Sequence, residues 1–420
     1  MNQLEYQTRR KRLLDRMEEG SLALVFSGYP KIKSEDEEYP FEANRHFYYL
    51  TGIDQQDCVL MLVANAGERK EFLFVPPFDE VKAKWYGKRL SVEEAREISG
   101  VRNVLIATAL QGRLHTELSG SYSDFGSVDK VYLDLAKETK IGEDLFSKEY
   151  ADSLLGKYPG LSVYPIQPLM IALRSRKSKA EAEAFREACD TTNLGIRALM
   201  AAIRPGVKEY ELADVFAHVI NDDNGYNGIS FNTIIASGPH ACTLHYPRPL
   251  GECKDGDLVL CDLGARHEGY CADVSRTFPV SGKFTPIQRK IYDIVLAANE
   301  MVAQMAAPGR TIAELQAATK NFLATECVAK GLLTKKEDID LVYYHGISHH
   351  IGLDTHDCSD RSAPLEEGAI ISDEPGLYFS DLGIGVRIED DLLITKSGCE
   401  VLTKDILKDP DALEAFFASR

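Results

Sequence analysis

The sequence predicts a mixed α/β (α+β) protein with two domains. With 420 residues, the chain is longer than one hydrophobic core usually supports. Apolar strand-like segments alternate with segments of helical period, and this alternation favours a mixed or parallel sheet covered by helices. Pro165 and Pro168 precede a charged, helix-forming stretch, as is typical of a linker that leads into a long helix. We therefore expect one domain over residues 1–170 and a second over residues 175–420.

The first domain is expected to begin with a basic helix that is followed by an apolar strand. Strand-like segments occur at residues 21–27, 58–63 and 71–75. Ser91 and Glu94 form a capping-box pattern, which predicts the start of a helix after these strands.

The second domain is expected to begin with helices and to continue with strands. Its first helix should end near Arg204, because Pro205 and Gly206 follow. The further elements are expected helices at 209–221, 286–306 and 311–331, strands at 257–264, 270–280, 369–372, 376–379 and 385–395, and a short helix after Asp409. The turn at 267–269 would join the first two strands into a hairpin and bring Asp262 and Asp273 together.

The charge balance argues against two classes of partner. Lys and Arg number 48 and Asp and Glu number 65, which gives a formal net charge of −17. Such a chain repels nucleic acid and anionic membrane surfaces, so neither is an expected partner. Nine scattered cysteines without a CxxC pair fit free thiols in a reducing compartment, and no apolar run is long enough to span a bilayer. A cytoplasmic location is the expectation that follows.

Five residues in the second domain form a candidate site for two metal ions. They are four carboxylates and one imidazole: Asp262, Asp273, His349, Glu374 and Glu389. These hard ligands suit a pair of manganese-like ions better than a cysteine-bound structural zinc. Two such ions would activate water for a hydrolytic attack. Each residue alone is more often a turn, cap or surface group, so the prediction rests on the joint pattern.

Several histidines near these residues are candidates for contact with a substrate. His245 and His356 could hydrogen-bond a substrate carbonyl or a developing oxyanion, although each could equally be an ordinary polar loop residue. His345 and His350 carry a weaker signal. Spacing alone does not decide whether His349 or His350 is the metal ligand.

The five segments that carry these residues resemble those of the pita-bread metallopeptidases. This group includes methionine aminopeptidase, aminopeptidase P, prolidase and creatinase, and the matching segments are residues 261–264, 272–278, 345–350, 373–378 and 386–391. The resemblance implies a pita-bread catalytic domain in which Asp262 and Asp273 are ligands and Asp273 bridges the metals. It also implies that His349, rather than His350, binds the second metal with Glu374, and that Glu389 bridges both.

The same resemblance assigns catalytic and substrate-binding roles. Glu374 would carry a proton from the attacking water to the leaving amine. His245 and His356 would hold the substrate around the scissile carbonyl, Arg387 would orient the site, and His345 would line the pocket. The implied cofactor is a pair of divalent ions, most simply Mn²⁺, although Co²⁺, Zn²⁺ and Fe²⁺ occupy similar sites.

The N-terminal half resembles the N-terminal domain of the aminopeptidases P. The resemblance lies in residues 39–52 and in residues 84–90, which contain Trp85. It implies that the substrates are peptides with proline at the second position and that the chain forms a homo-dimer or homo-tetramer. By analogy, residues 36–44 and Trp85 would help to close the site of a neighbouring subunit.

Two alternatives remain open. The segment between Tyr378 and Arg387 is short, as it often is in prolidases, so an Xaa-Pro dipeptidase is the first alternative. A non-catalytic binding protein on the same scaffold is a remote one, because such relatives lose metal ligands and none of the five is missing here.

Overall fold

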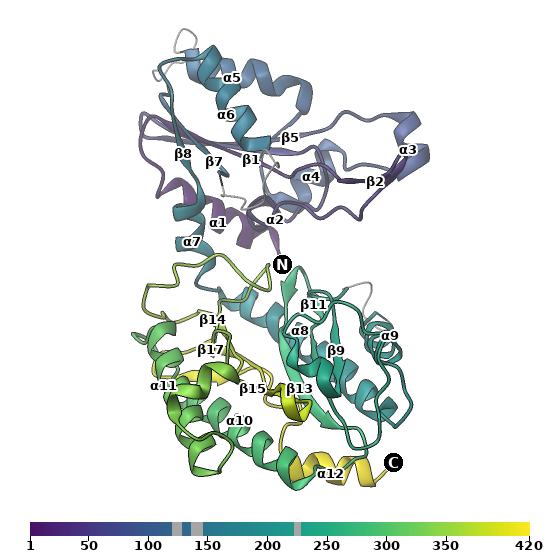
Figure 1. Cartoon of the computed structure of the whole chain (residues 1–420). Coiled ribbons are helices and arrows are strands. Elements are labelled where there is room, and N and C mark those ends of the chain that lie inside the picture. Colours follow the sequence, from purple (N-terminus) through teal and green to yellow (C-terminus); the bar gives the residue numbers. More distant parts are fainter. Residues whose placement is uncertain (120–127, 136–145, 222–227) are drawn as a thin grey trace. The chain divides into compact units, whose positions relative to one another are not determined.

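The computed structural model describes residues 1–119, 128–135, 146–221 and 228–420, and these residues form two compact units (Figure 1). Unit 1 is Met1–Leu173 and unit 2 is Arg174–Arg420. Each unit contains helices, strands and its own apolar core. The mixed α/β class expected from the sequence is confirmed. Among the helices of the described residues, none is both long enough and apolar enough to cross a membrane.

Unit 1 is built on a six-stranded mixed sheet with the order β6-β5-β4-β1-β7-β8. The strands are β1 (Ser21–Phe26), β4 (Val59–Asn65), β5 (Glu68–Val75), β6 (Asn103–Ile106), β7 (Lys130–Leu133) and β8 (Ser162–Pro165), with a small separate hairpin of β2 (Ile32–Ser34) and β3 (Glu37–Glu38). β4 pairs antiparallel with β1 and β5, whereas the outer pairs are parallel. β1 and β4 are central and almost continuously apolar, which is the pattern of strands buried on both faces.

Helices surround this sheet. They are α1 (Gln3–Leu14), α2 (Arg45–Thr51), α3 (Glu80–Tyr86), α4 (Val92–Ser99), α5 (Leu110–Ser119), α6 (Phe146–Lys157) and α7 (Gln167–Arg174), the last ending at the first residue of unit 2. The capping box predicted at Ser91 is present, with Glu94 as the reciprocal partner. α3 differs from the other helices because it has no buried residue.

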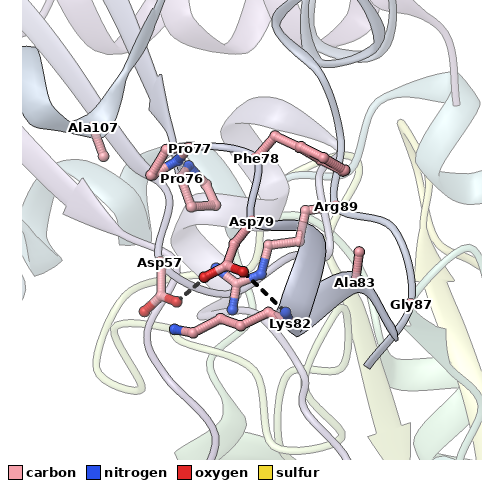
Figure 2. Close-up of a pocket in the computed structure, with 10 residues that line it drawn as sticks. All are labelled: Asp57, Pro76, Pro77, Phe78, Asp79, Lys82, Ala83, Gly87, Arg89 and Ala107. Carbon is pink, nitrogen blue, oxygen red and sulfur yellow. Dashed lines mark hydrogen bonds and ion pairs between the residues drawn. The ribbon is translucent and has the colours of Figure 1, made fainter. Parts of the chain in front are cut away.

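A small pocket of about 240 Å³ lies beside α3 (Figure 2). Asp79 caps the helix by accepting hydrogen bonds from the amides of Val81 and Lys82. Arg89 crosses the pocket to pair with Asp57 at 2.9 Å, so its guanidinium group is already engaged.

Unit 2 places helices around a group of short sheets (Figure 1). The helices are α8 (Lys179–Ala202), α9 (Glu209–Ile220), α10 (Pro286–Met305), α11 (Ile312–Ala329) and α12 (Pro410–Ala418). The strands are β9 (Ile234–Ser237), β10 (Leu258–Leu263), β11 (Arg266–His267), β12 (Tyr270–Cys271), β13 (Val274–Pro279), β14 (Ile370–Asp373), β15 (Gly376–Phe379), β16 (Ile384–Arg387), β17 (Asp390–Ile394) and β18 (Cys399–Val401). Short 3₁₀ turns occupy Ala107–Ala109 in unit 1 and Gly238–Cys242, Lys336–Leu341 and Ser380–Leu382 in unit 2.

The predicted hairpin is confirmed, because β10 pairs antiparallel with β13 and Asp262 lies opposite Ser275. Two segments were predicted as single continuous strands, and this prediction was wrong. Residues 270–280 divide into β12 and β13 at Asp273, and residues 385–395 divide into β16 and β17 at Glu389. The two later strands belong to different sheets, because β16 pairs with β15 and β17 with β14. At both breaks the backbone leaves the ladder, and the residue at each break is one of the proposed metal ligands.

Candidate active site

Asp262 and Asp273 enter the site from the β10–β13 hairpin. Both are buried, and Asp273 directly precedes β13. The amide of Asp273 donates a hydrogen bond of 3.1 Å to the side-chain oxygen Oδ2 of Asp391 instead of to a backbone carbonyl oxygen. Gly264 permits the close crossing of the two strands here, because a Cβ atom at this position would lie 1.9 Å from the carbonyl oxygen of Ala272.

His349 and Glu374 reach the same place from the loop before β14 and from the turn after it. The amide of His349 donates to Ser372 Oγ at 2.9 Å, and Ser372 Oγ donates to Glu374 Oε1 at 3.3 Å. His349 Nε2 lies 3.4 Å from Asp273 Oδ2 and 3.5 Å from Glu374 Oε1. Its Nδ1 lies 3.1 Å from the carbonyl oxygen of His350. This contact favours the tautomer with the proton on Nδ1, which leaves Nε2 free as a metal ligand.

Glu389 and Arg387 both contact Ser275 on β13. Ser275 Oγ donates to Glu389 Oε2 at 2.8 Å and accepts from Arg387 Nε at 2.8 Å. The amide of Glu389 also donates to the carbonyl oxygen of Ser275 at 3.0 Å. Arg387 Nη2 pairs with Asp262 Oδ2 at 2.7 Å. The hydroxyl of Ser275 therefore joins the two residues that the sequence placed two positions apart.

The acidic residues of this cluster fit a divalent cation. Oxygen and nitrogen atoms of Asp273, His349 and Glu389 lie within 4.8 Å of one another. Burial and the carboxylate of Asp262 raise the pKa of Asp273 well above its usual range, and burial and Asp273 raise the pKa of Glu389 in the same way. Within the part of the chain that the structure describes, Asp262 Oδ1 is buried and has no hydrogen-bond partner. A bound cation would give this oxygen a partner and offset the repulsion between the carboxylates.

The nine residues to which the resemblance assigns a role in the catalytic domain line one cavity of about 410 Å³ in unit 2. Asp262, Asp273, His349, Glu374, Glu389 and Arg387 are the residues at its polar floor, and His245, His345 and His356 are the three histidines around them. His350 is buried and does not occur among the described lining residues. Only His349 of this pair therefore faces the carboxylates.

A chain of hydrogen bonds connects His345 to the acidic cluster. Arg387 Nη1 donates to Tyr378 Oη at 3.0 Å, and Tyr378 Oη lies 2.8 Å from His345 Nε2. Since Arg387 already donates to the tyrosine oxygen, the hydroxyl proton is directed at His345 Nε2. Burial and the nearby charge of Arg387 lower the pKa of His345 to about 4, so the ring is neutral near pH 7.

His356 stacks on His349, with 3.9 Å between the ring centroids. Burial and the neighbouring ring of His349 lower the pKa of His356 to about 4. A neutral imidazole at this place can donate one hydrogen bond without adding positive charge to the metal site. His245 is an exposed residue at the edge of the cavity.

Several residues of the site carried no strong sequence signal. Ser275 and Tyr378 are polar partners of Arg387, and the rest of the lining consists of Phe231, Ile234, Leu244, Gly346, Ser348, Thr355 and Arg361. The alternation of Asp273, Ser275 and Thr277 on one face of a strand could have indicated Ser275. The apolar wall of Phe231, Ile234 and Leu244 comes from separate loops and strands, which no local pattern brings together.

A second group of buried charged residues contacts the backbone of Glu389 and the side chain of the next residue. Arg276 is fully buried and donates to the carbonyl oxygens of Ser275 and Glu389 at 2.9 and 2.5 Å. It also pairs with Asp390 at 2.7 Å, and Lys408 pairs with the other oxygen of Asp390 at 2.5 Å. Arg276 and Lys408 hold the pKa of Asp390 below its usual range in spite of its burial. These contacts fix the backbone at the break between β16 and β17.

The sequence matches two families that together cover most of the chain. Residues 183–396 match Metallopeptidase family M24, and residues 6–124 match the N-terminal domain of aminopeptidase P. The chain is 34% identical to the Xaa-Pro aminopeptidase of Escherichia coli strain K12, with 99% of this chain and 98% of the relative covered. It is 32% identical to the Xaa-Pro aminopeptidase of Haemophilus influenzae, with 96% and 95% covered.

Solved structures of related proteins have the same fold. Aminopeptidase P from E. coli with the inhibitor Pro-Leu superposes with a TM-score of 0.90 at 33% identity, over 100% of this chain and 99% of that one. Proline aminopeptidase P II from Yersinia pestis gives a TM-score of 0.89 at 33% identity, over the whole of both chains. The metal-ligand chemistry of the cavity, the two matched domains and these full-length relatives agree, and the chain belongs to metallopeptidase family M24, with the two-domain architecture of the aminopeptidases P.

Proposed function

We propose that this protein is an Xaa-Pro aminopeptidase, a metallo-hydrolase that removes the N-terminal residue from peptides with proline at the second position. The observation that carries the proposal is the convergence of four carboxylates and His349 on one cavity that also contains His345, His356 and Arg387. The names of the full-length relatives support the choice of substrate.

Two divalent ions would be held by Asp262, Asp273, His349, Glu374 and Glu389. When bound, such ions polarise the scissile carbonyl and make water acidic enough to serve as a nucleophile near neutral pH. Mn²⁺ is the ion that we propose, since oxygen-rich ligands suit it. A solved structure of aminopeptidase P from E. coli is zinc-substituted, so that protein can accept zinc. Elemental analysis of the purified protein should give about two ions per chain by this proposal, and one ion would contradict it.

Glu374 would act as general base and then as general acid. Glu374 is a carboxylate that lines the cavity and lies 3.5 Å from His349 Nε2, so it is placed to accept and release a proton beside the proposed metal ligands. Glu374 would take a proton from the attacking water and pass it to the amine of the leaving proline.

The histidines would orient the peptide. His356 and His245 would donate hydrogen bonds to the scissile carbonyl and stabilise the charge that develops on its oxygen. His345, which burial and the nearby charge of Arg387 keep neutral near pH 7, would line the pocket beside the proline. Arg387 would orient Asp262 and, through Ser275, Glu389.

The assay that tests this function compares peptides of different length. We expect cleavage of Xaa-Pro-Yaa tripeptides with release of the first residue, and loss of that cleavage in Asp273→Ala. Cleavage of Xaa-Pro dipeptides but not of tripeptides would instead support the dipeptidase alternative, which the names of the relatives do not favour. Full activity of Asp273→Ala would contradict the assigned site.

We also propose that the chain forms a homo-dimer or homo-tetramer and acts in the cytoplasm. Trp85 on α3 is 77% exposed, and Phe78, Val81 and Tyr86 beside it are also exposed. A second copy of the chain that covered this aromatic surface would give these side chains apolar partners. Sedimentation of the protein tests the assembly, and a monomer would contradict it. The nine cysteines are all free, which supports a reducing compartment; location in cells by microscopy tests it.

A further inference from the structure

A cluster of buried charges lies where unit 2 begins. Arg174, Lys177 and Asp357 are 3%, 8% and 8% exposed. Lys177 Nζ lies 3.0 Å from Asp357 Oδ2, and Arg174 pairs with Asp357 Oδ1 and, at 2.8 Å, with Asp354. Arg174 and Lys177 precede the matched M24 region, which begins at residue 183. None of the three residues belongs to the metal cluster described above.

Arg174 and Asp357 remain charged within this cluster. Burial would lower the pKa of Arg174, but Asp357 raises it above its ordinary value. Burial would raise the pKa of Asp357, but Arg174 and Lys177 lower it. Removing one partner of a buried ion pair leaves an uncompensated charge and is strongly destabilising, so these side chains must stay together in the folded protein. The segments fixed here are the chain before α8 and the loop that ends at Asp357.

That loop leads directly to the active-site histidines. The amide of Asp357 donates to the carbonyl oxygen of His350 at 2.8 Å, which closes the loop on the residue next to His349. Gly352 lies against the cluster, because a Cβ atom there would be 2.1 Å from Asp357 Oδ2 and 3.1 Å from Lys177 Cε. His356 immediately precedes Asp357 and stacks on His349. The position of the His356 ring therefore depends on where Asp357 is held.

We propose that Arg174 and Lys177 are positioning residues, which act through Asp357 to hold His356 against His349 in the geometry that the substrate requires. This inference rests on the proposed function for the role of His356. By this proposal the segment before α8 contributes to the geometry of the active site, although the side chains of Arg174 and Lys177 do not line the cavity.

The test uses Lys177→Met in the full-length, metal-loaded protein. Replacing Asp357 would leave two buried cations without their carboxylate and could prevent folding, whereas Lys177→Met leaves the pair of Arg174 and Asp357 intact. We expect kcat/KM for an Xaa-Pro-Yaa tripeptide to fall about tenfold, as is typical when a residue that orients an active-site group is lost. Lys177→Arg, which keeps the charge, should recover most of this loss. Arg176→Ala is the matched control, since Arg176 is in the same segment but pairs at 3.1 Å with the exposed Glu366.

The background of His356→Ala separates positioning from a general structural role. If Lys177 acts through His356, Lys177→Met should lower kcat/KM less than twofold when His356 is already absent. A full tenfold loss in that background, or wild-type kcat/KM in Lys177→Met alone, would overturn the proposal.

A second measurement does not depend on activity. In metal-free protein with isotope-labelled histidine, the ring signals of His356, assigned by their loss in His356→Ala, should shift in Lys177→Met and stay unchanged in Arg176→Ala. Unchanged signals in Lys177→Met would overturn the proposal. Wild-type protein that does not cleave Xaa-Pro-Yaa peptides, combined with shifted signals, would contradict the proposed function and leave the positioning of His356 supported.

Discussion

Arg387 contacts three groups of the site through its guanidinium group. Its three donors reach Asp262, Ser275 and Tyr378 at 2.7, 2.8 and 3.0 Å. Burial would lower the pKa of Arg387, but Tyr378 and Asp262 raise it well above its ordinary value, so it is a permanent charge. A planar guanidinium can satisfy three acceptors in different directions, and an ammonium group on a flexible stem cannot reproduce that geometry.

We therefore expect Arg387→Lys to lower kcat/KM by about 10- to 100-fold, with the fold retained. The positive charge remains, so the loss would come from the disordered orientation of Asp262 and Glu389 and from the lost contact to Tyr378. Steady-state kinetics on a tripeptide and thermal unfolding measure the two effects. Tyr378→Phe, which removes only the hydroxyl, should lose less activity; an equal loss would mean that the path to His345 accounts for the whole effect.

At the scale of elements, the site depends on strands that cross closely and then break. β10 and β13 pair up to Leu263 and Val274, and Asp273 leaves the ladder one residue beyond. Gly264 is the position that makes this crossing possible, because the backbone of Ala272 occupies the place of a side chain. Gly385 in β16 has a similar role, with a Cβ atom only 2.3 Å from the carbonyl oxygen of Ala241.

Gly264→Ala should destabilise the protein by about 1–3 kcal/mol, the usual range for overpacking a close contact, and backbone atoms have less room to move than side chains. The same displacement should separate Asp262 from Asp273 and weaken metal binding. Urea unfolding of the metal-free protein and metal titration measure the two effects. Gly398→Ala is the control, because a Cβ atom there meets nothing within 4 Å. Equal stability of the two variants would show that the strands can separate without cost.

At the scale of the whole molecule, the acidic cluster is expected to make the stability of the folded protein depend on bound metal and on pH. The pKa values of Asp273 and Glu389 are raised in the folded state above ordinary values of about 3.9 and 4.3. Their protonated forms favour the folded state. This contribution is fully present below about pH 4 and is lost as pH rises through the raised folded pKa.

The free energy of unfolding of the metal-free protein should therefore fall as the pH is raised toward neutrality. The fall should be smaller in the Glu389→Gln variant. Added metal should restore stability to the wild type, by about 2.7 kcal/mol at a free concentration 100 times its Kd, and should restore much less in Glu389→Gln. Thermal unfolding with and without chelator at several pH values measures both effects. Glu366→Gln, at an exposed position, is the control. The interpretation fails if Glu389→Gln and wild type respond alike to pH and metal.

The sequence by itself determined the class of fold, the hairpin of β10 and β13 and the residues with metal-ligand chemistry, because each depends on local pattern and side-chain type. Alternation predicted which side of β10 carries Asp262, and turn residues predicted the chain reversal. Local pattern could not predict the breaks at Asp273 and Glu389, because there a contact from a distant segment replaces the strand ladder.

Only the tertiary structure decided which groups surround the ligands. Ser275 joins Arg387 to Glu389 across more than a hundred residues of chain, and Asp357 receives its partners Arg174 and Lys177 from about 180 residues away. Such pairs leave no periodic signal, since their contact depends on how separate elements pack. The identity of the proposed ligands is a property of the sequence, and their orientation is a property of the folded chain.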